Sequence, residues 1–157
     1  MKKDKVEVII NSDGCPVPIY QFTDYFFLLR ACYALALEEA ISEMIEMSYD
    51  DDDVAVDTST TTEYTAHIIE SILPSMSPDK LNELSNIVLS EEEELFIENI
   101  TRKNPFEIIF SGIGIALVSA LIISGGNFEI GLTKLKIEIP PLGTGITKLR
   151  KAFKIKE

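Results

Sequence analysis

The sequence of 157 residues has few of the side chains from which metal and redox sites are built. It contains one histidine, two cysteines and no tryptophan. A single histidine excludes a site with several histidines within one chain. Cys15 and Cys32 do not have the CxxC spacing of zinc and redox sites. The sequence therefore predicts no bound metal and no cofactor.

The common catalytic motifs are also missing. GxGxxG, GxxxxGK[ST], HExxH and GxSxG do not occur, so the usual signatures of nucleotide binding, zinc proteolysis and serine hydrolysis are absent. Gly143-x-Gly145 could approach a ligand, but a turn followed by the start of a helix explains it better. We therefore expect a protein that is not an enzyme.

Basic side chains are scarce, since 14 Lys and Arg face 26 Asp and Glu, a net charge of -12. This balance disfavours nucleic-acid backbones and anionic lipid headgroups. Residues 1–124 carry 7 bases and 23 acids, whereas residues 125–157 carry 7 bases and 3 acids. The basic end is either a solvated surface attracted to the acidic body or a site for an anionic ligand. The candidate ligand-binding residues are Lys148, Arg150, Lys151 and Lys154.

Hydrophobic periodicity and turn residues predict an α+β fold. Strands at Lys5–Ile10 and Val17–Tyr20 should form an N-terminal hairpin, and a long helix should run from Thr23 to Met47. A polar loop follows at residues 49–62. Short helices are expected at Glu63–Leu73 and Asp79–Val88, and strands at Leu95–Arg102 and Ile130–Ile139. A basic amphipathic helix is expected at Gly145–Phe153.

The longest uncharged run is Ile108–Ser124. As a helix it would be about 26 Å long, close to the roughly 30 Å of a bilayer core. A helix over Phe106–Ser124 predicts either a marginal transmembrane span or the buried central helix of a soluble oligomer. Strand-like segments on both sides favour the second interpretation, because they could pair and bring the two ends together.

Two faces of this expected helix differ in composition. One face is a stripe of small residues suited to close helix packing, which predicts a homo-oligomer. Its members are Gly112, Ala116 and Ser119. The nearly opposite face could line a pore or its mouth in a ring of helices. Its members are Glu107, Ser111, Gly114 and Val118.

These features divide the chain into three parts: an acidic soluble α+β domain (1–104), the apolar transmembrane or oligomerisation helix (105–126), and a strand with a basic C-terminal helix (127–157). Asp4 and Glu7 interrupt any signal-peptide core, so the N-terminal domain should be cytoplasmic with reduced cysteines. The membrane interpretation then predicts the bacterial inner membrane, and the alternative predicts a wholly cytoplasmic protein.

Several short motifs follow one another in the C-terminal third. They are Asn104-Pro105-Phe106-Glu107, Ser124-Gly125-Gly126, Pro140-Pro141-Leu142-Gly143-x-Gly145-Ile146 and Leu149-Arg150, within about Asn104–Phe153. In these, the chain resembles the small membrane-channel effectors of Hailong-type bacterial anti-phage defence. The resemblance implies an oligomeric channel controlled by a nucleotide or oligonucleotide that a partner nucleotidyltransferase makes.

The leading functional prediction is thus an oligomeric membrane protein, a ligand-gated pore or effector in anti-phage defence. The alternative is a soluble oligomeric adaptor or interaction protein in which the apolar helix is buried.

Overall fold

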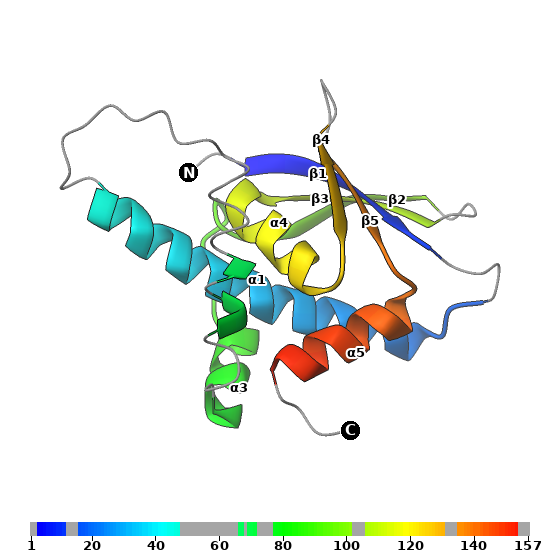
Figure 1. The fold of residues 1–157 in the computed structure, drawn as a ribbon, viewed down its shortest axis with the longest axis horizontal. Coiled ribbons are helices and arrows are strands. Elements are labelled where there is room, and N and C mark those ends of the chain that lie inside the picture. The colour runs from blue at the N-terminus through cyan, green and yellow to red at the C-terminus, as the bar shows by residue number, and fades with distance from the viewer. Residues whose placement is uncertain are drawn as a thin grey trace.

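A computed structural model of the protein describes residues 3–11, 16–47, 66–67, 69–71, 77–101, 106–130 and 135–153. Its strands form one mixed five-stranded sheet, and its helices lie on one side of that sheet (Figure 1). Helices and strands both contribute to a single core. The predicted α+β class is therefore confirmed.

The sheet has the order β2-β3-β1-β5-β4, with β1 at its centre. β1 is antiparallel to β3 and parallel to β5, and the β2–β3 and β4–β5 pairs are antiparallel. The bounds are Lys3–Ile10 for β1, Phe96–Thr101 for β2, Phe106–Ile113 for β3, Asn127–Ile130 for β4 and Leu135–Ile139 for β5. One sheet thus joins strands from all three segments into which the sequence divides.

Four labelled helices accompany the sheet. They are α1 (Ile19–Met47), α3 (Pro78–Asn86), α4 (Gly114–Ile123) and α5 (Leu142–Ala152). Residues 66–67 and 69–71 are helical as well. The start of α3 is as the sequence predicts, because the Ser77 side chain accepts a hydrogen bond from the Lys80 amide and Pro78 begins the helix.

The core lies between the sheet and the helices. Side chains on the helix side of the sheet are at most 1% exposed: Val6, Val8, Ile10, Ile108, Phe110, Ile137 and Ile139. Two ring contacts join α1 to β3, Phe22 with Phe106 at 5.3 Å and Phe26 with Phe110 at 6.1 Å between centroids. The alternation of buried and polar residues along β1 and β5 follows from this one-sided cover.

The predicted N-terminal hairpin is wrong. Pro16 to Pro18 are not in a strand, and α1 begins at Ile19, four residues before the expected start. β1 instead pairs with β3 and β5, which come from much later in the chain. A turn signal reports only local geometry, so it does not identify the partner of a strand. Residues 12–15, which hold the predicted turn, lie outside the described residues.

The predicted continuous helix over Phe106–Ser124 is also wrong. Phe106–Ile113 forms β3, and only Gly114–Ile123 is helical. β3 lies between β1 and β2, so much of it is shielded and its residues form an apolar run without clear alternation. In the described residues, no helix has both the length and the apolar composition needed to cross a membrane.

The other predicted elements have mixed outcomes. A strand near Leu95–Arg102 and a basic helix near Gly145–Phe153 are present as β2 and α5. The single strand expected at Ile130–Ile139 is two strands, β4 and β5. Much of the helix expected at Glu63–Leu73, and the whole polar loop at residues 49–62, lie outside the described residues.

Candidate functional site

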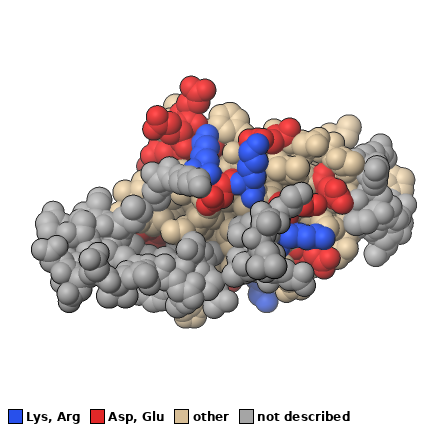
Figure 2. All heavy atoms as spheres, turned by 90° about the horizontal axis from the view of Figure 1, so that it is seen from above, with Lys and Arg blue, Asp and Glu red and all other residues tan. Residues whose placement is uncertain are grey.

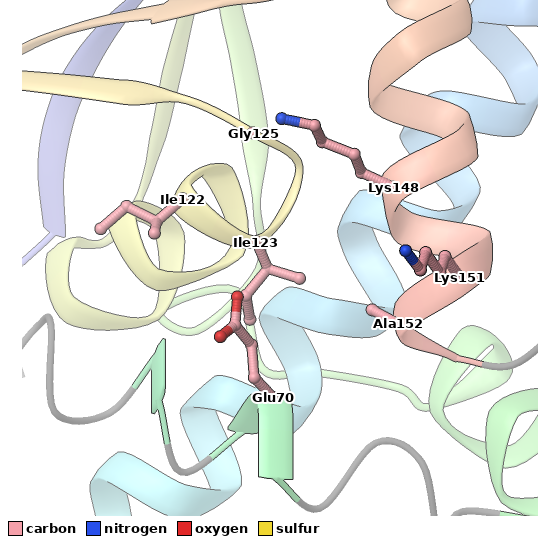
Figure 3. A pocket seen from close by; sticks show the side chains of 7 residues that line it. All are labelled: Glu70, Ile122, Ile123, Gly125, Lys148, Lys151 and Ala152. Carbon is pink, nitrogen blue, oxygen red and sulfur yellow. The ribbon is translucent and has the colours of Figure 1, made fainter.

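A pocket of about 400 Å³ lies where the end of α4 approaches α5. Figure 3 shows Lys148 and Lys151 on the α5 side and Glu70, from the short helical segment, on the opposite side. The remaining lining residues are Ile122, Ile123, Gly125 and Ala152. The volume is in the range of small-molecule sites, roughly 300–1,000 Å³. The pocket therefore combines two cationic groups, one carboxylate and an apolar surface.

The amphipathic pattern of α5 determines where its lysines point. Its inner side is buried through Leu142, Gly145, Ile146 and Leu149. Lys148 and Lys151 are exposed and three residues apart, a spacing that places both on one side of a helix. Packing of the apolar side against the body of the protein thus turns both ammonium groups toward the pocket.

Arg150 has a different role from its two lysine neighbours. Its guanidinium Nη2 lies 3.1 Å from Oδ2 of Asp24 on α1, so it joins α5 to α1. Within the described part of the chain, neither Lys148 nor Lys151 forms a salt bridge. Two of the predicted anion-binding residues therefore meet at the pocket, and Arg150 does not. Lys154, the fourth, lies outside the described residues.

Gly125 has no side chain where the end of the Lys148 side chain lies, next to the end of α4. The glycine has φ +96°, which L side chains rarely adopt, and its amide donates to the Ile122 carbonyl at 2.9 Å. A Cβ atom at this position would lie 2.7 Å from Cδ and Nζ of Lys148. The turn therefore favours glycine, and any side chain at this position would also displace the flexible end of Lys148.

The turn after α4 is held from inside the core. Ser124 is fully buried, and its hydroxyl donates to the Leu121 carbonyl at 2.7 Å. The Tyr25 hydroxyl of α1 lies 3.1 Å from the hydroxyl oxygen of Ser124. Burial raises the pKa of Tyr25, so this hydroxyl stays neutral at physiological pH. These contacts fix the wall of the pocket that carries Gly125.

The electrostatics favour binding of an anion. The two lysines outnumber the single glutamate, so the pocket has a local excess of positive charge in a chain of net charge -12. The end of α4 contributes a partial negative charge from its carbonyl groups, which offsets part of this positive excess. The apolar residues of α4 and α5 add contact area for a hydrocarbon group.

The residues predicted to line a pore are separated in the structure. Glu107 and Ser111 lie on β3, with side chains on the face of the sheet away from the helices, since they pair with Ile9 and Lys5 of β1. Gly114 begins α4, and Val118 is buried within it at 3% exposure. The four residues therefore do not form one helical face. The pore itself stays a prediction.

The predicted packing stripe is divided in the same way. Gly112 belongs to β3, where an added Cβ would lie 3.2 Å from the Tyr33 ring. Ala116 and Ser119 are fully buried in α4. The three residues do not form one helical stripe, because Gly112 lies in a strand and the other two in a helix. Self-association through them stays a prediction.

Cys32 and His67, two other candidate reactive residues, are not among the residues that line this pocket. Burial raises the pKa of the Cys32 thiol to about 12, so it is protonated and unreactive at neutral pH. His67 is exposed on the short helical segment. In the described ranges, no group of three or more His, Cys, Asp or Glu side chains could hold a metal ion.

Sequence reasoning missed Glu70 and Gly125 as parts of this site. Gly125 appears in the sequence analysis only as part of the motif Ser124-Gly125-Gly126. Glu70 is far from the basic end of the chain, and it has no motif of its own. The positive φ of a glycine after a helix was a detectable signal, but the approach of Glu70 required the tertiary structure.

Comparison of the chain with protein-family models, curated proteins and solved structures finds no match.

Proposed function

We propose that the protein is a non-catalytic binding protein whose pocket between α4 and α5 takes a small organic anion. The observation that carries this proposal is the pair Lys148 and Lys151, which line one pocket without salt-bridge partners among the described residues. In an acidic chain, two such groups at one pocket offer a local attraction for a negative charge.

The other lining residues narrow the class of ligand. Glu70 would repel a second acidic group but would accept a hydrogen bond from a hydroxyl or ammonium group. Ile122, Ile123 and Ala152 would contact a short hydrocarbon part. The expected ligand therefore has one acidic group, one hydrogen-bond donor and a small apolar part.

This role agrees with the adaptor alternative, in which the apolar segment is internal. The segment supplies β3 and α4, and both contribute to the core. Insertion of the same segment into a bilayer would require β3 to leave its pairing with β1 and β2. The ligand-gated pore, its nucleotide regulator and a membrane location stay predictions from the sequence.

A matched pair of probes tests the acidic group and the donor separately. Lactate and propionate have the same carbon skeleton and carboxylate, but only lactate carries a hydroxyl group. We expect both to shift the amide NMR signals of Gly125 and Ile123 saturably, with tighter binding of lactate. Glu70→Ala should remove that preference. Inorganic phosphate, titrated in parallel, distinguishes recognition of phosphate from recognition of carboxylate.

Lysine variants test the cationic groups. Lys148→Gln and Lys151→Gln should each weaken binding by about tenfold, since a hydrogen bond to a charged group contributes about 1.5–3 kcal/mol. Lys136→Gln is the matched control, because Lys136 is an exposed lysine on β5 away from the pocket. Equal affinities in all three variants, or no saturable shift with any probe, would refute the proposal.

A further inference from the structure

β2 is an edge strand whose outer edge no described element covers. Five of its six residues, Phe96 to Ile100, are exposed, and three of these five are large and apolar. Phe96, Ile97 and Ile100 are 42%, 43% and 48% exposed. An uncovered edge presents unpaired backbone N–H and C=O groups, which can pair with another strand. β2 also lacks the proline and the inward-pointing charges that commonly protect an edge.

The pairing of β2 with β3 shows on which face of the sheet each side chain lies. Ile97 and Ile100 are opposite Phe110 and Ile108, whose side chains are buried on the helix side. Phe96, Asn99 and Thr101 are opposite Ser111, Ile109 and Glu107 on the outer face. Glu98 lies at a register irregularity, and its carboxylate reaches Lys5 of the outer face at 2.6 Å.

The order of faces along β2 is therefore the same in both directions. From Phe96 to Thr101 it runs outer, helix side, outer, outer, helix side, outer. The irregularity at Glu98 produces this symmetry, because it places two successive residues on the outer face. A bulge commonly disrupts pairing at a sheet edge, but here it makes the two halves of the strand equivalent.

A strand with this symmetry matches an antiparallel copy of itself. Residues directly opposite each other in antiparallel strands project to the same face. Among registers that pair more than half of each β2, only one satisfies this rule throughout. It places Ile97 opposite Ile100, Glu98 opposite Asn99, and Phe96 opposite Thr101 of the second copy. A two-fold axis between Glu98 and Asn99 relates the copies.

We propose that β2 is the interface of a two-fold dimer of this chain, in which two five-stranded sheets join into one. The exposed Ile97 and Ile100 of one copy then contact Ile100 and Ile97 of the other, which removes their apolar surface from water. A second copy of the chain fits this edge, because an antiparallel partner of β2 must have the same order of faces, and β2 itself has that order.

The charges at this edge permit association in spite of the net charge of -12. The register places Glu98 opposite an uncharged asparagine, and each Glu98 keeps its own Lys5 partner. The Lys3 ammonium lies 4.2 Å from the centre of the Phe96 ring. Figure 2 shows basic side chains among acidic ones on the face of the sheet turned away from the helices. Like charges are therefore not directly opposite in the paired strands.

Disulfide trapping tests the register. With Cys15 replaced by serine, a mixture of Ile97→Cys and Ile100→Cys chains should form disulfide-linked dimers on mild oxidation, because these positions are opposite each other. Either variant alone should form few. A mixture of Ile97→Cys and Asn99→Cys is the matched control, since these side chains lie on opposite faces. Equal linkage in both mixtures would overturn the register.

Mass measurement tests the interface. The wild-type chain should have twice its mass of 17.5 kDa in light scattering and dissociate on dilution. Ile97→Lys should be monomeric, because the register buries two lysines against isoleucines. Val88→Lys should remain dimeric, since Val88 is 93% exposed outside β2. A monomeric wild type, or a folded Ile97→Lys dimer, would overturn the proposal. If circular dichroism shows Ile97→Lys unfolded, the trapping result decides.

Discussion

Replacement of Tyr33 by phenylalanine should destabilise the junction at which the apolar segment changes from strand to helix. The Tyr33 hydroxyl accepts a hydrogen bond from the Ile113 amide at 3.0 Å and donates one to the Glu93 carbonyl. Ile113 is the last residue of β3, and α4 begins at the next residue. One hydroxyl on α1 thus satisfies the main chain at the point where the strand ends.

The expected loss follows from the burial of these groups. Ile113 is 3% exposed and Tyr33 is fully buried, so water does not replace the lost hydroxyl at the Ile113 amide. A buried donor without a partner costs about 1–3 kcal/mol. The Glu93 carbonyl belongs to a partly exposed residue and can bind water instead. We expect a loss of about 2 kcal/mol in the free energy of unfolding and a fall in Tm of about 4–8 °C.

Urea unfolding monitored by circular dichroism measures this loss. The midpoint should fall while the m-value stays constant, because the surface exposed on unfolding is unchanged. Tyr20→Phe is the matched control: Tyr20 is also on α1 but is 63% exposed, so its removal should change stability by less than about 0.5 kcal/mol. If the two variants unfold at the same urea concentration, the hydroxyl does not support the junction as we argue.

Three further predictions concern separate parts of the fold. Hydrogen bonds from Arg30 lower the pKa of Glu94 in the folded state, so their stabilisation is present at neutral pH and is lost as the pH falls through that lowered pKa. Glu94→Gln should therefore lower the free energy of unfolding by about 1 kcal/mol at pH 7 and leave it unchanged in strong acid, as measured by urea unfolding at several pH values. Gly126→Ala should lower Tm, because the added Cβ would lie 2.8 Å from the main-chain carbonyl oxygen of Leu121 in α4. Gly143→Ala is the control and should leave Tm unchanged, since the nearest atom there is a side-chain nitrogen of Gln21, 3.6 Å away. Similar Tm values for the two variants would contradict this. In the Cys15→Ser variant, the native Cys32 thiol should react with Ellman's reagent only as fast as the protein opens, and fast native labelling would show that it is not buried as described.

Local patterns in the sequence were sufficient for much of the secondary structure. The start of α3 depends on Ser77 and Pro78 themselves, and their chemistry is visible in any window that contains them. The strand β1 and the long helix α1 likewise follow from periodicity within a few residues. Of the candidate anion site, the sequence indicated the lysines of α5, because the excess of positive charge in residues 125–157 is a property of composition.

The apolar segment shows where local information was not enough. The residues Ile108, Ile109 and Phe110 suit a strand, but an uninterrupted apolar run suits a buried helix as well. These residues form a strand because they pair with β1 on one side and with β2 on the other. Those partners are distant in sequence, so no window around the segment contains them.

The amino-acid sequence by itself determined the α+β class, the acidic character and most element positions, because these depend on composition and on side chains within one or two turns. Only the tertiary structure decided which strands pair, where the apolar run changes from β3 to α4, and that Glu70 lies across a pocket from Lys148 and Lys151. The reason is that strand pairing and pocket formation depend on side chains separated by tens of residues, whose contacts form only as the core excludes water.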